Sequence, residues 1–112
     1  MKEKLILGLI EPVTIIGNKE IIIKARIDTG ATSSSMDHNL AEELGFGPAV
    51  SSKIVKSASG VKKRPIVKVK LILKNLEIEE EFTLADREHM TYPILIGQNI
   101  LKKGHFLIDP NK

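Results

Sequence analysis

Short runs of apolar residues, each followed by a polar turn, dominate the chain and predict a protein built mainly of β-strands. Runs of strand length cover residues 4–10 and 13–16. We expect Glu11-Pro12 to separate them, because proline cannot donate a hydrogen bond to a central sheet ladder. After a polar turn, residues 21–27 form a further apolar run that is rich in isoleucine. The first part of the chain is therefore expected to contain three strands.

The middle of the chain predicts strands joined by tight turns. Residues 54–55 lead to the small residues 57–60, which suit a hairpin tip, and residues 66–73 return as a β-branched strand. A turn at Asn75-Leu76 then leads into a strand at residues 77–84. The expected cross-strand pairs are Leu73 with Ile78, Val69 with Phe82, Lys74 with Glu77, and Lys70 with Glu81. Pairs of opposite charge contribute about 0.2–1 kcal/mol each, and they help to fix the register.

Two short helices complete the pattern. Asp37 is a candidate N-cap for a helix of about two turns that ends at Gly45. Residues 98–104 predict one or two further helical turns, between a short strand ending at Gly97 and a last apolar strand at residues 105–109. A chain of 112 residues is long enough for one core, so we expect a single domain, residues 1–112, that is nearly all β.

The composition narrows the possible chemistry. The chain has no cysteine, which excludes disulfides, thiolate zinc sites and cysteine nucleophiles. No apolar run approaches the roughly 20 residues of a membrane span, and the N-terminus has too short an apolar run for a signal peptide. We therefore expect a cytoplasmic protein with no membrane partner.

Positive charge is concentrated in the middle of the chain, although the net charge is only +3. No acidic residue occurs between Glu43 and Glu77, and the basic residues of that segment are Lys53, Lys56, Lys62, Lys63, Arg64, Lys68, Lys70 and Lys74. This segment favours either an acidic partner or a solvated strand face whose lysines protect a sheet edge. Nucleic acid is not an expected partner, because no aromatic side chains for base stacking are interleaved with the basic residues.

The strand at residues 21–27 runs directly into Asp28, which is followed by the small residues Thr29, Gly30 and Ala31. Placing a carboxylate at the end of a buried strand is costly unless it is paired, neutralised or hydrogen-bonded. Two interpretations explain its presence. Asp28 either caps its own loop, as aspartate often does before glycine, or serves as an acid and base in catalysis.

Three features together resemble the retropepsin family of aspartic proteases. They are the Ile27-Asp28-Thr29-Gly30-Ala31 stretch, a hairpin tip with Gly60 about thirty residues later, and the Ile94-Leu95-Ile96-Gly97-Gln98-Asn99-Ile100-Leu101 segment before a terminal strand. Their order and spacing match that family along the whole chain. The resemblance implies a closed all-β barrel with one or two short helices and one catalytic half per chain.

The resemblance also implies an aspartic endopeptidase with Asp28 as its catalytic residue. Two adjacent carboxyl groups cannot both ionise, so they share one proton and can act as base and acid together. The chain contains one Asp-Thr-Gly sequence. The second carboxylate must therefore come from another copy, and an isologous homodimer would place the two Asp28 side chains together.

Roles for the neighbouring residues follow from the same resemblance. Thr29 is expected to hydrogen-bond across the two-fold axis and support the dyad, and Gly30 lets the backbone approach the substrate. The expected substrate-binding residues are Gly30, Ala31, Thr32 and Ser33 in the loop and Ala58, Ser59 and Gly60 in a flap. No cofactor is implied. The expected partners are a second copy and a peptide or protein substrate, and the basic strands would suit an acidic one.

Some features depart from the retroviral pattern. Gln98 occupies the position of a common arginine, and Thr32 stands where an acid is frequent. A related group with the same Asp-Thr-Gly-Ala sequence, often labelled as zinc-dependent peptidases linked to ATP-grasp peptide ligases, has an arginine after the alanine. Kinship with that group would suggest glutamate-rich tails as substrates.

Metal and serine chemistry find little support in the sequence. The three histidines are widely spaced, so no metal site is expected. Ser33–Ser35 lack a nucleophile motif and are expected to be loop and cap residues. One alternative to an endopeptidase remains open: a non-catalytic retropepsin-like module for dimerisation or peptide binding. Asp28 and Gly60 together favour the enzyme.

Overall fold

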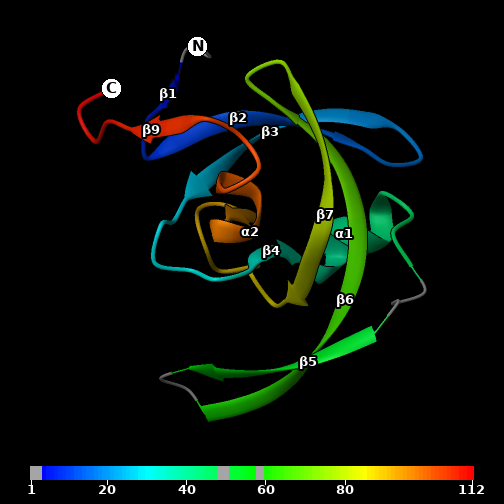
Figure 1. Cartoon of the computed structure of the whole chain (residues 1–112). Helices are drawn as coiled ribbons and strands as arrows, with labels where there is room; N and C mark the ends of the chain where they lie inside the picture. Colours follow the sequence, from blue (N-terminus) through cyan, green and yellow to red (C-terminus); the bar gives the residue numbers. More distant parts are fainter. Residues whose placement is uncertain (1–3, 48–50, 58–59) are drawn as a thin grey trace.

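The computed structural model describes residues 4–47, 51–57 and 60–112, which form nine strands and two short helices (Figure 1). The strands are β1 (Leu5–Leu7), β2 (Ile10–Ile16), β3 (Glu20–Ile27), β4 (Ser34–Asp37), β5 (Ser51–Ser57), β6 (Gly60–Leu73), β7 (Leu76–Ala85), β8 (Ile94–Ile96) and β9 (Phe106–Ile108). The helices are α1 (His38–Glu43) and α2 (Gln98–Leu101). Neither described helix has the length and apolar character needed to cross a membrane.

Six strands close into a barrel. The large sheet has the order β2-β3-β8-β4-β7-β6-β5, and β2 also pairs with β6. This additional pairing joins the first strand of the order to the sixth, and β5 extends from β6 as one arm of a projecting hairpin (Figure 1). Apolar side chains from the barrel strands fill the interior, including Ile15, Ala25, Val69, Phe82 and Ile96. The predicted all-β closed barrel with two short helices is confirmed.

The predicted N-terminal strands are wrong in their boundaries. The chain leaves β1 at Gly8 and starts β2 at Ile10, so Pro12 lies inside a strand. This is possible because β6 pairs only with residues 14–16 of β2. Pro12 therefore has a strand partner on one side, Lys24 of β3. The missing N–H of proline costs no hydrogen bond on a side that lacks a ladder.

The predicted register of the β6–β7 hairpin is also wrong, by two residues. The turn lies at Lys74-Asn75, whose φ angles of 51° and 70° are left-handed, and not at Asn75-Leu76. Two consecutive left-handed residues make the tight turn whose twist matches that of antiparallel strands. The observed pairs are Leu73 with Leu76, Leu71 with Ile78, Lys70 with Glu79, Lys68 with Glu81 and Val67 with Phe82. A shift of two keeps every side chain on its predicted face, since strand side chains alternate with period two.

Strand β4 was missed, because its sequence Ser-Ser-Met-Asp has no apolar run. The serines predicted as loop residues, Ser34 and Ser35, are buried between two other strands. Asp37 nevertheless has its predicted role: its Oδ2 accepts a hydrogen bond from the backbone N–H of Leu40 at 3.3 Å and caps α1. The chain therefore enters α1 directly from a barrel strand.

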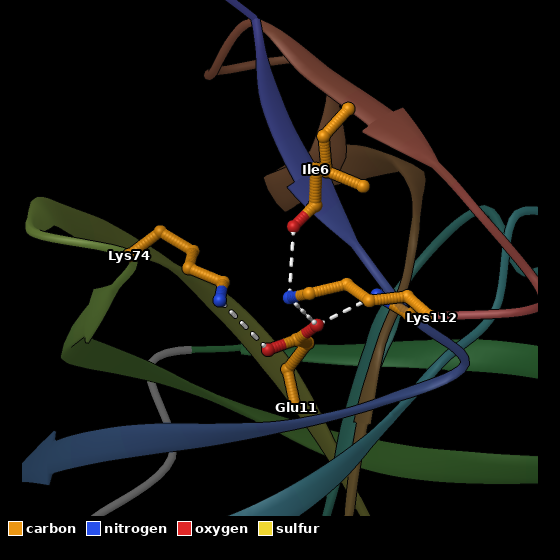
Figure 2. A network of polar contacts seen from close by, with 5 residues as sticks. Ile6, Glu11, Lys74 and Lys112 are labelled. Carbon is orange, nitrogen blue, oxygen red and sulfur yellow. Dashed lines mark hydrogen bonds and ion pairs between the residues drawn. The ribbon is translucent and has the colours of Figure 1, made fainter.

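A second, two-stranded sheet pairs β1 with β9 in parallel. A buried carboxylate, Glu11 of β2, ties this sheet to the barrel (Figure 2). Its Oε2 accepts hydrogen bonds from the backbone N–H of Gly8 at 2.6 Å and from Nζ of Lys112 at 2.8 Å, and its Oε1 lies 3.3 Å from Nζ of Lys74. The Lys112 ammonium also donates to the carbonyl of Ile6 at 3.0 Å. Three segments that are distant in sequence, residues 6–11, Lys74 and Lys112, therefore meet at one side chain.

Opposing effects act on the ionisation of Glu11. Burial alone would raise the pKa of this carboxyl group. The hydrogen bond from Gly8 and the ammonium groups of Lys112 and Lys74 outweigh burial, so the pKa of Glu11 is lowered from its ordinary value of 4.5. Glu11 is thus stabilised in its charged form.

Candidate functional site

Asp28 follows the last residue of β3 and precedes a turn at residues 29–30. Its N–H donates to the carbonyl of Ile96 in β8 at 2.9 Å, which continues the β3–β8 pairing by one residue. Its Oδ1 accepts the N–H of Gly30 at 2.9 Å. Its Oδ2 accepts no hydrogen bond from the part of the chain that the structure describes. The loop-capping interpretation is therefore correct for one oxygen, and the other remains available to a ligand.

Helix α2 holds the Asp28 loop in place through hydrogen bonds. The N–H groups of Gln98 and Asn99 donate to the carbonyls of Ala31 and Thr32 at 2.8 and 3.2 Å. The first N–H groups of a helix lack partners inside the helix, so the Asp28 loop satisfies them. The side chain of Gln98 also donates to the Thr29 carbonyl at 2.8 Å. A neutral amide thus holds the loop at the position where an arginine is common in the retroviral pattern.

Gly97 allows this close approach of α2 to the loop. A Cβ atom at this position would lie 2.4 Å from the carbonyl oxygen of Ser33 and 2.8 Å from that of Ala31. Both atoms belong to the backbone, so no side-chain rotation could relieve the contact. Gly97 is therefore required by space, and its φ of −104° is one that any residue can adopt.

Gly97→Ala is expected to lower the free energy of unfolding by about 2 kcal/mol, because overpacking in a rigid region typically costs 1–3 kcal/mol. Displacement of the loop carbonyls should also reduce activity. Thermal denaturation of both proteins measures the loss. Gly8→Ala is the matched control, since a Cβ there would meet its nearest atom at an ordinary 3.4 Å. Equal melting temperatures for Gly97→Ala and the wild type would contradict the expectation.

A partly buried polar relay connects β4, α2 and β7 next to the loop. The Ser34 hydroxyl accepts the N–H of Gly97 at 2.9 Å and donates to Oδ1 of Asn99 at 2.7 Å. The Asn99 side chain donates in turn to the carbonyl of Glu81 at 2.9 Å. Sequence reasoning missed this relay. The one feature of the sequence that could have indicated it is Asn99, the second residue of the short helix after Gly97. An asparagine at that place does not by itself identify Ser34 as its hydrogen-bond partner.

A cavity of about 440 Å³ lies between the loop and the β5–β6 hairpin. Its lining residues are Gly30, Ala31, Thr32, Ser33, Ser35, Ile54, Lys56, Arg64, Thr83, Arg87 and Leu95. The structure thus brings the four predicted loop residues together at one cavity, which we call the cleft. Gly60 is exposed, with a φ of 117°, at the start of β6, and it does not line the cleft. The other two predicted flap residues, Ala58 and Ser59, lie outside the described residues.

Three basic side chains line the cleft: Lys56, Arg64 and Arg87. Arg87 is only 9% exposed, and its Nε donates to the carbonyl of Tyr92 at 3.1 Å. Its backbone N–H donates to Oδ1 of Asp37 at 2.8 Å. Burial, and then repulsion by Arg64, lower the pKa of Arg87. A buried guanidinium in repulsion with a second one favours a bound anion.

Sequence reasoning missed Arg87, because it lies in a polar connection that gave no structural signal. Ser35 was missed for the same reason as β4. Its Oγ is buried and has no hydrogen-bond partner among the described residues. A buried hydroxyl without a partner is costly, and this one belongs to a residue that lines the cleft.

We also considered a larger cavity and possible metal sites outside the Asp28 loop. A cavity of about 680 Å³, lined in part by His38, Phe46 and Pro65, is larger than the cleft but includes none of the Asp28 loop. Within residues 4–47, 51–57 and 60–112, no three histidine, aspartate or glutamate side chains gather as they would around a metal ion. The cleft is lined by all four predicted loop residues, Gly30, Ala31, Thr32 and Ser33.

Comparison with known proteins identifies the family of this architecture. Residues 46–112 match the model of the RimB-like family, described as retropepsin-like aspartic endopeptidase RimB. This match begins after the Asp28 loop. No curated protein matches the chain.

Solved structures match over most of the chain. Lpg0085, a protein of unknown function from Legionella pneumophila, shares 20% identity, with a TM-score of 0.70 over 98% of this chain and 96% of that one. The EIAV protease complexed with the inhibitor HBY-793 shares 18% identity, with a TM-score of 0.70 over 92% and 93%. A retropepsin-like aspartic protease from Rickettsia conorii shares 20% identity, with a TM-score of 0.59 over 84% and 78%. These similarities establish the retropepsin-like fold.

Proposed function

The chain belongs to the RimB-like family of retropepsin-like aspartic endopeptidases, and from this premise we propose that it hydrolyses peptide bonds with a dyad of two Asp28 side chains in a homodimer. The observation that carries the proposal is the geometry of Asp28. One oxygen is fixed by the Gly30 N–H at 2.9 Å, while the other has no partner in the described chain. A fixed carboxylate with one available oxygen per subunit is half of an acid–base pair.

The chemistry needs two protonation states at once. An ionised Asp28 takes a proton from water as the water attacks the scissile carbonyl carbon. The protonated Asp28 of the second copy donates a proton to the carbonyl oxygen. The shared proton keeps one carboxyl neutral, because two adjacent carboxylates repel each other. Thr29 follows Asp28 and is exposed, and its proposed role is to support the pair across the two-fold axis.

Exposed apolar side chains at Leu9 and on strands β1 and β9 support dimerisation. Ile6, Leu9 and Leu107 are 41%, 50% and 47% exposed. Leu9 lies against the strand that carries Asp28, because its carbonyl accepts the N–H of Ile27 at 2.8 Å. Contact between two copies through this surface would bury apolar area and bring the loops together. The terminal strands β1 and β9 pair within one chain, so a second copy would meet an already formed two-stranded sheet.

The substrate is proposed to be an extended peptide held in the cleft. Ala31, Thr32 and Ser33 form its floor, and the β5–β6 hairpin, with Gly60, acts as the flap. The three basic side chains of the cleft favour an acidic residue in the peptide. An adjoining cavity lined by Glu80 and Glu81 would repel an acidic side chain, so we expect the acidic residue on the Arg87 side.

The proposal is tested by incubating the protein with a peptide library between pH 4 and 7 and measuring its mass in solution at micromolar concentration. We expect cleavage that a pepstatin-type inhibitor blocks, together with a dimer. A chelator should have no effect. Binding of peptides without cleavage would favour the non-catalytic peptide-binding module, and loss of activity with the chelator would favour a metallopeptidase.

Arg87→Gln is expected to reduce the preference for a glutamate-containing peptide over its glutamine counterpart by about tenfold, measured as the ratio of kcat/KM values. Arg87→Lys keeps a positive charge and should retain most of the preference. Lys102→Gln removes an exposed charge outside the cleft and serves as the control. An unchanged preference in Arg87→Gln would refute the assignment of Arg87 to acidic recognition.

A further inference from the structure

A second cavity adjoins the cleft on the β6 strand. It has a volume of about 400 Å³, and its lining residues are His38, Lys62, Lys63, Arg64, Pro65, Leu84, Ala85, Asp86 and Met90. Arg64 lines both this cavity and the cleft. We propose that this second cavity is an exosite that binds an acidic stretch of the substrate polypeptide outside the segment that is cleaved. The inference rests on the proposed function.

The basic side chains of the exosite form no ion pairs within the described chain. Lys62 and Lys63 are exposed, and neither they nor Arg64 form an ion pair with the described residues. The ion pairs among the described residues are formed by other lysines: Lys19, Lys74, Lys103 and Lys112. Three cations without carboxylate partners create a positive potential that attracts an anion.

One carboxylate opposes this charge. Asp86 lines the exosite, and its Oδ1 accepts the backbone N–H of Glu88 at 3.1 Å. That hydrogen bond engages one of its oxygens in the local turn. The basic side chains still outnumber the acidic one. The cavity therefore keeps a positive balance, and an acidic ligand is preferred over a basic one.

The apolar part of the lining fits a polypeptide better than a nucleic acid. Pro65, Leu84 and the exposed Met90 offer surface against which the methylene groups of glutamate side chains can pack while their carboxylates reach the lysines. The imidazole of His38 is the one aromatic ring among these lining residues, and no phenylalanine, tyrosine or tryptophan is there to stack on a base. An acidic polypeptide that leaves the cleft past Arg64 enters the exosite directly. We therefore assign the exosite to the substrate chain itself.

The test compares one cleavable peptide in three forms: alone, with a terminal run of glutamates, and with the same run of glutamines. We expect the glutamate extension to lower KM by about five- to tenfold with little change in kcat, and added salt to weaken this advantage. The double variant Lys62→Gln/Lys63→Gln should lose the advantage. Its rate on the short peptide serves as its own reference, because both residues lie in the proposed flap hairpin.

The double variant Lys68→Gln/Lys70→Gln is the matched control. It removes two exposed lysines of the same strand that do not line the exosite, so it should keep the advantage. Equal losses in both double variants would overturn the exosite, because general attraction would then explain the effect. Retention of the advantage in Lys62→Gln/Lys63→Gln would also overturn it.

A binding measurement separates the exosite from the proposed catalysis. A labelled glutamate-rich peptide is titrated with Asp28→Asn and with Asp28→Asn carrying the Lys62→Gln/Lys63→Gln changes, and its fluorescence anisotropy is recorded. Weaker binding to the second protein supports the exosite even if no cleavage is ever found. Equal binding overturns it. Competition by an oligonucleotide as strong as that by the glutamate peptide would instead assign the surface to nucleic acid.

Discussion

Asp28→Asn is expected to lower kcat/KM for peptide hydrolysis by at least about a thousandfold, because the amide can neither take a proton from water nor share one with a second carboxyl. The fold should remain intact. The side-chain carbonyl of asparagine can still accept the Gly30 N–H that Asp28 accepts at 2.9 Å. Rates of cleavage, with circular dichroism and thermal denaturation of the same sample, measure both effects.

Asp109→Asn is the matched control for this variant. Asp109 also forms a hydrogen bond to a backbone N–H two residues later, that of Asn111 at 2.9 Å, and it is exposed and outside the cleft. Its change removes one carboxylate from the same kind of turn and should leave the rate unaltered. If Asp28→Asn cleaves as fast as Asp109→Asn, catalysis by Asp28 is disproved.

The sequence predicted the loop that carries Asp28 because all of its signals are local. An isoleucine-rich strand leads to an aspartate and then to small residues, and each step has a direct physical reading. The helix that supports the loop was predicted in the same way, from Gly97 and the residues after it. The contacts between the two, such as that of Gln98 with the Thr29 carbonyl, required the structure.

The missed parts of the cleft depend on contacts between distant segments. β4 is a strand because β7 and β8 pair with its two edges, and its buried Ser34 has polar partners in Asn99 and Thr83. Arg87 reaches the cleft because Asp37, fifty residues earlier, binds its backbone. Neither fact leaves a periodic pattern in the sequence. Local propensity yields to tertiary contacts at such positions.

The β6–β7 hairpin shows a different limit. The sequence identified both strands and the face of each side chain, but it placed the turn one residue too late. Lys74 is an unusual residue for a left-handed conformation, which costs most side chains about 1–2 kcal/mol. Its ammonium lies 3.3 Å from the buried Glu11. The ion pair with a distant strand offsets part of that cost and could not be inferred from the hairpin alone.

Glu11→Ala is expected to lower the free energy of unfolding by about 3 kcal/mol. The variant leaves the buried Gly8 N–H without an acceptor and separates two ammonium groups from their shared carboxylate (Figure 2). Lys74 and Lys112 are 35% and 36% exposed, so water can partly solvate them and limits the loss. Glu11→Gln keeps an acceptor and should cost less. Chemical denaturation of the three proteins measures the difference.

Glu43→Ala is the control, because it removes a carboxylate whose ion pair is on the surface. Glu43 and Lys19 are 63% and 59% exposed and 3.6 Å apart. Exposed pairs of this kind contribute about 0–1 kcal/mol. If Glu11→Ala proves no more destabilising than Glu43→Ala, the buried network does not hold the terminal sheet to the barrel.

The lowered pKa of Glu11 predicts how this contribution depends on pH. The charged form is favoured by folding, so the stabilisation is complete above the unfolded pKa of 4.5 and is lost as the pH falls through the lower pKa of the folded state. The difference in unfolding free energy between the wild type and Glu11→Gln should therefore be constant at neutral pH and shrink below pH 4.5. A difference that grows on acidification would mean that burial, and not the two lysines, dominates the ionisation of Glu11. Because Glu11 joins β2 to the β1–β9 sheet, its protonation should loosen that sheet, and with it the surface proposed to bring two Asp28 loops together.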